Sequence, residues 1–228
     1  SGHAYSTIQE IAAEASKKGL KYVGITDHGP TMPGGPHIFH IANQRVIPDI
    51  IEGVEILKGV EANILDQEGQ LDVPNDILES LDIVIAGLHD VCIEPWDMEG
   101  NTKALLKTME NKNVDIISHS GNPAFPIDKE KFVLGAKKTN TLIEINNSSF
   151  VKSRKGSKEN CKDIAILCKK HKVPIIVNSD SHIAFDVGGF DEVIKLLKAI
   201  EMPEELIINT CTDRFVSYLK DKGRARFI

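Results

Sequence analysis

The chain alternates short apolar runs, rich in β-branched residues, with longer stretches in which apolar residues recur at helical spacing. A first helix is expected to begin at Ser6 or Thr7 and to end at Gly19. The short runs predict strands at residues 22–25, 55–60, 82–87, 114–117, 141–145 and 173–177. The longer stretches predict further helices at about 40–51, 101–111, 129–139, 158–171 and 189–199. Apolar strands separated by helices are typical of a parallel sheet that is covered on both faces.

The composition places the chain among ordinary globular proteins. Its 228 residues are 41% hydrophobic and 26% charged, with no recognisable linker, so we expect one domain over residues 1–228. The formal net charge of -6 argues against a nucleic-acid partner, because phosphate contacts need clustered cations. No apolar run approaches the roughly 20 residues of a membrane span, and no secretory signal opens the chain. These features favour a cytoplasmic protein without a membrane partner, and they leave the oligomeric state open.

The four cysteines contribute little to a functional interpretation. No pair of them has the C-x-x-C spacing that is typical of zinc or redox motifs. A chain of this length can bury a sufficient core without disulfides. We therefore expect reduced thiols that pack in the interior.

Polar residues with metal-binding chemistry follow almost every predicted strand. In a parallel α/β fold the carboxyl ends of the strands meet at one face, where functional sites are built. A single histidine at a strand end is usually structural, but histidines at four strand ends together with a glutamate indicate a shared site. The residues at the successive strand ends are His28, Glu61, His89, His119, Asn146 and Asp180, with His182 close behind.

The donor types in this cluster narrow the chemistry. Imidazole and carboxylate donors without cysteine suit Zn²⁺, Mn²⁺ or Fe²⁺. Glu61 can bridge two cations, and Asp180 and His182 form a D-x-H pair. The sequence has no G-x-S-x-G elbow, no phosphate-binding P-loop and no G-x-G-x-x-G after a strand. Metal-assisted hydrolysis is the reaction class that remains.

Seven motifs follow one another along the chain from His3 to about Tyr218. They are His3-Ala4-Tyr5-Ser6-Thr7, Ile25-Thr26-Asp27-His28-Gly29-Pro30, Gly59-Val60-Glu61-Ala62-Asn63, Ala86-Gly87-Leu88-His89, Ile117-Ser118-His119-Ser120-Gly121-Asn122-Pro123, Glu144-Ile145-Asn146-Asn147-Ser148-Ser149-Phe150 and Ser179-Asp180-Ser181-His182. In this order they resemble the motifs of the PHP family (polymerase and histidinol phosphatase), and residues 153–161 resemble the YcdX-type branch of that family. The resemblance implies a trinuclear-zinc phosphatase on a distorted seven-stranded (β/α) TIM-like barrel.

The resemblance also implies a role for each metal ligand. One ion is expected to take His3, His28 and His182, and a second is expected to take Glu61, His89 and His119. Glu61 would bridge to a third ion, which Asp180 would also bind. The remaining ligands of that third ion come, in the family, from an H-x-H motif on a first strand that this sequence lacks. We expect that the sequence is a shortened form of a longer chain, and a divergent member with a two-metal site is the alternative.

Two residues outside the metal set are candidates for contact with substrate. His37 lies in a loop that enters a helix, where it either contacts a phosphate or donates a proton to the leaving group, or else only caps the helix. Arg154 follows a strand end and is expected to bind a phosphate through its two-pronged guanidinium. The alternative for Arg154 is a turn that is exposed to solvent.

Together these observations predict a phosphatase that hydrolyses small phosphomonoesters. A hydroxide that bridges two ions near Glu61 would attack phosphorus, with Glu61, Asp180, Arg154 and His37 as the catalytic residues. Zinc, in up to three ions, is the expected cofactor, and Mn²⁺ or Fe²⁺ are possible. The alternatives are a PHP-type phosphodiesterase or nuclease, and a metal-binding domain without catalytic activity.

Overall fold

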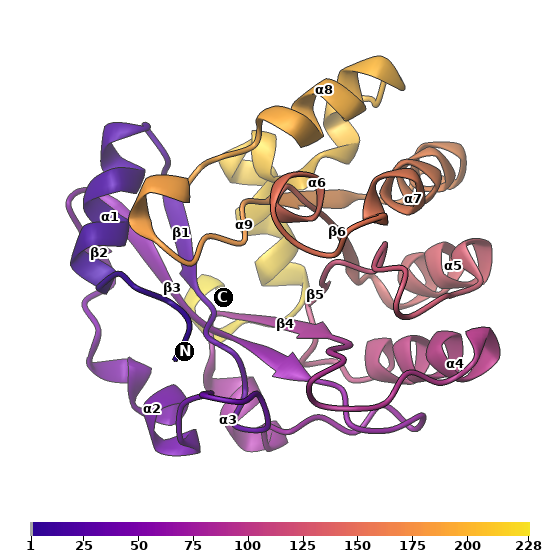
Figure 1. Ribbon diagram of the computed structural model, residues 1–228. Helices are drawn as coiled ribbons and strands as arrows, with labels where there is room; N and C mark the ends of the chain where they lie inside the picture. Colours follow the sequence, from indigo (N-terminus) through magenta and orange to yellow (C-terminus); the bar gives the residue numbers. More distant parts are fainter. Residues whose placement is uncertain (1) are drawn as a thin grey trace.

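Six parallel strands form one curled sheet in the computed structural model, which describes residues 2–228 (Figure 1). Neighbouring strands follow the order β1-β3-β4-β5-β6-β7, and a short β2 pairs antiparallel beside β3. The strands are β1 (Tyr22–Ile25), β2 (Ile50–Ile51), β3 (Val54–Asn63), β4 (Ile83–Gly87), β5 (Ile116–Ile117), β6 (Leu142–Asn146) and β7 (Ile175–Asn178).

The α-helices of residues 2–228 mostly follow the strands and cover the outer face of the sheet (Figure 1). Thr7 caps the first of them through a complete capping box with Glu10, as its position in the sequence predicts. The helices are α1 (Ile8–Lys17), α2 (Ile38–Ala42), α3 (Asn75–Ser80), α4 (Met98–Met109), α5 (Lys129–Thr139), α6 (Ser148–Val151), α7 (Ser157–His171), α8 (Asp191–Ala199) and α9 (Thr212–Asp221).

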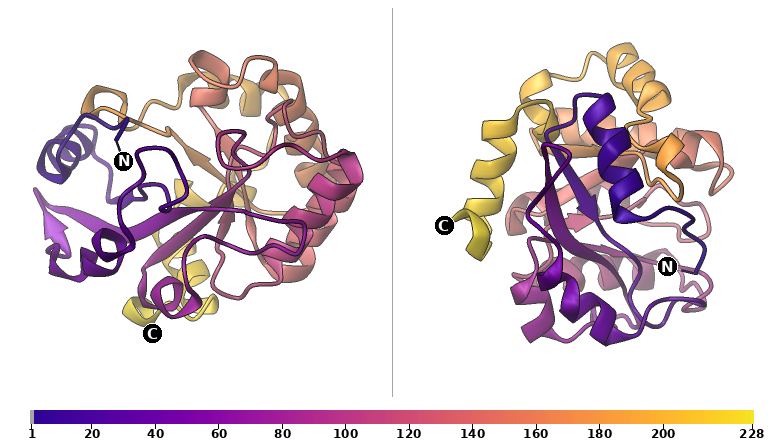
Figure 2. Two further views of the ribbon diagram at one scale, coloured as in Figure 1. Left: turned by 60° about the horizontal axis from the view of Figure 1, so that its bottom comes forward. Right: turned by 90° about the vertical axis from the view of Figure 1, so that its left-hand side faces the viewer.

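The sheet separates two apolar layers because successive strand residues point to opposite faces. On β4, Val84 and Ala86 belong to the large core under the outer helices, whereas Ile83 and Ile85 face the inside of the curl. Helix α9 packs against this inner layer at the amino ends of the strands, where the Tyr218 hydroxyl donates to the Asp115 carbonyl at 2.6 Å. Figure 2 shows α9 and the N-terminal segment at opposite ends of the strands. The carboxyl ends therefore stay open for a site.

The expected α/β fold with parallel strands is confirmed, but the sheet does not close into a barrel within residues 2–228. Strands β1 and β7 are its two edges. The sheet has seven strands, as the resemblance implies, although the seventh is the antiparallel β2. The parallel part is thus a curled half-barrel.

The helix predicted at residues 40–51 is wrong. Helix α2 ends at Ala42, and a 3-10 turn over Asn43–Val46 leads into β2. The buried side chain of Gln44 both donates to and accepts from the backbone of Gly59, at 2.6 and 2.9 Å. Pro48 then cannot donate a helical hydrogen bond. Tertiary pairing with β3 therefore overrides the helical spacing of this segment.

No helix in the part of the chain that the structure describes combines the length and the apolar character that a membrane span requires.

Candidate metal centre

The side chains predicted from the strand ends gather at the carboxyl ends of the strands. His28 follows β1 and pairs with Glu61 of β3 in an isolated parallel bridge. His89 follows β4, and His119 follows β5. Asp180 and His182 follow β7, and His3 precedes α1. Residues far apart in the sequence thus meet at the open end of the sheet because parallel strands begin and end together.

Glu61 lies at the centre of the buried part of this cluster. One of its carboxylate oxygens is 3.0 Å from Nε2 of His119 and 3.3 Å from Nε2 of His89. The other is 3.8 Å from Nδ1 of His28. Nε2 of His89 and Nε2 of His119 are themselves 3.1 Å apart. Ser118 donates its hydroxyl to Glu61 at 2.7 Å, which fixes the carboxylate. Several potential ligand atoms thus converge on one small volume.

A second set of donors lies beside the first, nearer to the solvent. The ring of His3 is 5.2 Å from that of His28 and 4.8 Å from that of His182, measured between centroids. Among residues 2–228, two groups have ligand atoms that all lie within 4.8 Å of one another. They are His3, His28 and His182, and His28, Glu61 and His89. His28 therefore belongs to both groups.

The environment of the cluster favours the protonation states that metal ligands need. Burial lowers the pKa of His28 to about 4 and also lowers the pKa values of His119 and His3. Burial alone would raise the pKa of Glu61, but hydrogen bonds from His119 and His89 hold it well below its ordinary value. Neutral imidazoles and an ionised carboxylate result, and divalent cations bind these forms. Nδ1 of His89 is moreover buried without a hydrogen-bond partner in the described chain. The donor set therefore fits divalent cations.

Arg154 lies in the site and not in a solvent-exposed turn. Its guanidinium donates to Asp180 at 2.7 Å through one nitrogen and to the Ser149 hydroxyl at 3.0 Å through another. Burial and the charge of Glu61 act to raise the pKa of Asp180, but the ion pair with Arg154 outweighs them and lowers it. Both residues have left-handed backbones, with φ of 50° and 51°. Non-glycine residues adopt this conformation infrequently, although aspartate does so more readily than most.

Glu144 is a site residue that the predicted ligand set does not contain. Its carboxyl group accepts the backbone N–H of His119 at 2.7 Å, the side-chain amide of Asn146 at 3.1 Å and that of Asn178 at 2.8 Å. The backbone of His119 has a φ of 28°, so this hydrogen bond fixes an unusual conformation. The sequence carries a signal for this role: Glu144 and Asn146 are two residues apart on a strand and therefore share its face.

Burial, with the nearby charges of Glu61 and Asp180, raises the pKa of Glu144 to about 7. Glu144 is only 5% exposed, and its buried carboxyl group accepts all three hydrogen bonds. These three hydrogen bonds indicate that Glu144 holds His119, Asn146 and Asn178 in position.

His37 lies at the N-terminus of α2, outside both donor groups of the described residues. Its Nδ1 accepts the backbone N–H of Phe39 at 3.1 Å, so the helix-cap role is present. Its ring also stacks on Phe39, with centroids 5.5 Å apart. Because Nδ1 accepts this bond, Nε2 is the nitrogen of His37 that can donate.

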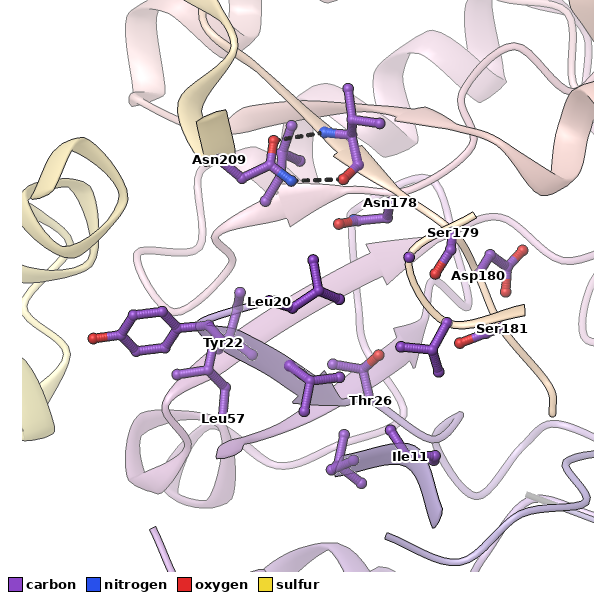
Figure 3. Close-up of a pocket in the computed structure, with 18 of the residues that line it drawn as sticks. Ile11, Leu20, Tyr22, Thr26, Leu57, Asn178, Ser179, Asp180, Ser181 and Asn209 are labelled. Atoms are coloured by element: carbon purple, nitrogen blue, oxygen red, sulfur yellow. Dashed lines mark hydrogen bonds between the residues drawn. The ribbon is translucent and has the colours of Figure 1, made fainter. Parts of the chain in front are cut away.

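A cavity of about 460 Å³ lies between the two edges of the sheet, bounded by β1, β7 and α1 (Figure 3). Much of its lining is apolar, including Ile11, Leu20 and Leu57. At the carboxyl end of the strands the lining becomes polar and includes Asp180. At this edge the side-chain amide of Asn209 donates to the carbonyl of Val177 on β7 and accepts its N–H.

Comparisons with known proteins reveal close relatives. No family model matches the chain. A probable phosphatase from Caldanaerobacter subterraneus subsp. tengcongensis is 59% identical over 225 residues, which are 98% of this chain and 89% of the relative. A probable phosphatase from Clostridium botulinum (strain Langeland) is 56% identical over 226 residues, which are 99% of this chain and 93% of the relative.

Two solved structures are similar in fold. One is a histidinol phosphate phosphatase from Lactococcus lactis with zinc, L-histidinol and phosphate, with a TM-score of 0.58 and 17% identity over 87% of this chain and 89% of that one. The other is a chain of an archaeal ribonuclease P with mature tRNA, with a TM-score of 0.58 and 13% identity over 96% of this chain and 89% of that one. At these identities the similarity shows the fold alone.

Proposed function

Because this chain belongs to the family of these probable phosphatases, we propose that it is a metal-dependent hydrolase of small phosphomonoesters, of the PHP type. The protein would form one domain over residues 1–228. The observation that carries the proposal is the convergence of Glu61 with His28, His89 and His119 at the carboxyl ends of the strands. Four ligand residues this close together, with an arginine nearby, suit a phosphate ester better than an uncharged substrate. The similar fold of a phosphatase solved with zinc supports the choice of metal.

The described residues offer ligands for two ions. His3, His28 and His182 would hold one of them, and Glu61, His89 and His119 would hold the other, with Asp180 and Glu61 available to a third. Zinc suits these donors, as do Mn²⁺ and Fe²⁺. Bound cations would supply a water of lowered pKa as the nucleophile, and positive charge that neutralises the phosphate oxygens.

The residues around the ligands would orient the substrate. Arg154 pairs with Asp180 in the structure, and its guanidinium is the group best placed to bind a phosphate oxygen at the same time. His37 would donate a hydrogen bond from Nε2, since the cap on α2 leaves that nitrogen protonated. Ser118 and Asn146 would hold the carboxylates of Glu61 and Asp180 in place.

The experiment that tests this function compares three substrate classes on the same preparation. The protein is stripped with a chelator, resupplied with Zn²⁺, Mn²⁺ or Fe²⁺, and assayed with p-nitrophenyl phosphate, bis-p-nitrophenyl phosphate and a single-stranded oligonucleotide. Hydrolysis of the monoester alone, dependent on the added metal, is the expected result. Preference for the diester or the oligonucleotide would favour the phosphodiesterase alternative. Tight metal binding without turnover of any of the three would favour the silent metal-binding domain.

Removing the acceptor oxygens of Glu144 is expected to weaken the centre without touching a ligand. Glu144→Leu leaves the donors of His119, Asn146 and Asn178 buried and unpaired, so metal affinity and kcat should fall by about 10- to 100-fold. Glu144→Gln keeps one acceptor oxygen for the His119 N–H, and the Asn178 amide can turn to pair with the new NH₂ group. Its kcat should therefore stay closer to that of the unmodified protein.

Equilibrium metal titration and steady-state kinetics on both variants check this expectation. A merely structural role for Glu144 would instead lower the melting temperature of the Leu variant while its metal affinity stayed at the value of the unmodified protein.

A further inference from the structure

Two buried polar atoms on neighbouring strands lack a hydrogen-bond partner among the described residues. They are the side-chain oxygen Oδ1 of Asn63, at the end of β3, and the ring nitrogen Nδ1 of His89, just after β4. Asn63 is completely buried, and His89 is 8% exposed. Leaving a buried acceptor or donor unpaired is unfavourable, so an acceptor and a possible donor in neighbouring positions call for an explanation.

Asn63 points to the same face of the sheet as the central ligand. Ala62 and Ile64 belong to the core under the outer helices, so Asn63 between them points to the inside of the curl. Glu61, two residues earlier on the same strand, points to that face as well. The side chain of Asn63 is therefore directed toward the ligand cluster.

Gly87 brings the ring of His89 beside Asn63. It is the register partner of Asn63 on β4, and neighbouring strands lie about 4.8 Å apart. The ring of His89 lies against Gly87, since a Cβ atom on this glycine would be 3.1 Å from Cε1 of His89. Nε2 of His89 faces Glu61 and His119. Nδ1 is therefore the ring nitrogen that remains for a partner outside the ligand cluster.

A carboxylate behind Asn63 fixes the orientation of its amide. Oδ1 of Asp72 accepts the backbone N–H of Asn63 at 2.8 Å, and Oδ2 accepts from Nδ2 of Asn63 at 2.6 Å. Nδ2 also donates to the carbonyl of Gly29 at 3.2 Å. A flipped amide would place its oxygen against these two acceptors, so Oδ1 of Asn63 faces away from them. Because β3 lies between β1 and β4, and Gly29 follows β1, the oxygen is offered to the β4 side.

The same carboxylate is tied to the loop that follows His28. Oδ2 of Asp72 accepts the backbone N–H of Thr31 at 2.9 Å. The carboxylate lies directly on Gly29, where a Cβ atom would be 2.2 Å from Oδ1 of Asp72, so only glycine fits there. The N–H of Gly29 in turn donates to the carbonyl of Glu61 at 2.9 Å. Asp72 is thus held in place by backbone on both sides.

We propose that Asn63 is a positioning residue for His89: its Oδ1 accepts the Nδ1–H of His89 and so leaves Nε2 unprotonated for a cation. Asp72 holds the amide of Asn63 in the orientation that this bond requires. A metal-binding histidine commonly donates its second ring nitrogen to a carboxylate, a carbonyl or water, and that bond fixes the tautomer. The inference rests on the proposed function, since it assigns His89 to a cation.

The tautomer of His89 can be observed directly by NMR of the zinc-loaded protein with nitrogen-15 in its histidines. His89→Gln identifies the signals. The expected result is a zinc-bound Nε2 and a protonated Nδ1, whose proton exchanges slowly with water and shows a nuclear Overhauser effect to the side chain of Asn63. In Asn63→Leu, which is nearly isosteric but offers no acceptor, this proton should exchange about 10-fold faster or more. Zinc affinity, measured by calorimetry, should fall by about 10- to 100-fold.

Two further variants separate positioning from a general loss of stability. Asp72→Asn frees the amide of Asn63 to flip, so the exchange rate and the zinc affinity should change in the same direction as in Asn63→Leu, by a smaller factor. Asn101→Leu is the matched control. Asn101 is also completely buried, and its amide bonds to the backbone of Trp96 and Pro126. This control should lower the melting temperature and leave the His89 signals and the zinc affinity unchanged.

Two results would overturn the proposal and leave the metal centre intact. One is a zinc-bound His89 without a proton on Nδ1 in the unmodified protein, a result that does not depend on the folding of any variant. The other is an Nδ1–H that exchanges at the same rate in the unmodified protein and in Asn63→Leu. If the expected His89 signals are found in a protein that hydrolyses no phosphomonoester, the role of Asn63 is supported and only the proposed function is wrong.

Discussion

Replacing Glu61 with glutamine is expected to lower the rate of phosphomonoester hydrolysis by about 10³-fold or more. The substitution would weaken the binding of a cation, and a bound cation lowers the activation free energy of such a reaction by several kcal/mol. The carboxylate lies within 4 Å of a ring nitrogen of each of His28, His89 and His119. Glutamine keeps the volume and one acceptor oxygen for the Ser118 hydroxyl, but it loses the charge that holds a cation among the imidazoles.

The fold of Glu61→Gln should persist, since the variant removes a buried charge and creates no cavity. Circular dichroism and the melting temperature of the metal-free protein check this point beside the kinetics. Glu55→Gln is the matched control on the same strand, because Glu55 pairs with Arg226 away from the site. Hydrolysis by Glu61→Gln at the rate of the Glu55 control would contradict the proposed centre.

His28→Ala is expected to remove more metal than His182→Ala, because His28 belongs to both donor groups and His182 to one. Loss of His182 leaves the Glu61 group intact and should cost one ion per chain. Loss of His28 weakens both groups at once. Replacing a residue that only supports a metal ligand typically lowers metal affinity or activity by about 10- to 100-fold. The kcat/KM of His28→Ala should therefore fall by more than about 10²-fold.

Elemental analysis of the purified variants measures the ions per chain directly. His171→Ala is the matched control, because His171 pairs with Glu130 at 2.8 Å on the surface, outside both groups. Equal metal content in His28→Ala and His182→Ala would show that the two groups do not share this residue. Unchanged content in both variants would remove the basis for the metal centre.

The strands and the identity of the clustered residues could be predicted because they depend on local sequence. Except for β2, which lies in a segment predicted as helix, each strand contains a short apolar run. The strand at residues 22–25 and the helix at residues 129–139 have the predicted bounds. The polar residue after each run was visible without any knowledge of distant contacts. The helix predicted at residues 40–51 failed because Gln44 bonds to Gly59 of a neighbouring strand, a contact that no local pattern encodes. Helix α9 went unpredicted, although it covers the inner layer of the sheet.

By itself, then, the sequence determined the alternation of strands and helices and the chemical types of the donors, since periodicity and residue identity are properties of short segments. The tertiary structure decided which atoms meet. The carboxyl group of Glu144 accepts the backbone N–H of His119, 25 positions away, and Arg154 pairs with Asp180, 26 positions away. Hydrogen bonds likewise join segments from both ends of the chain, since the N–H of Tyr5 donates to the carbonyl of His182 and the N–H of Ala184 donates to the hydroxyl of Ser6. Such contacts depend on how parallel strands align at one end of a sheet, and that alignment is set by the packing of the whole core.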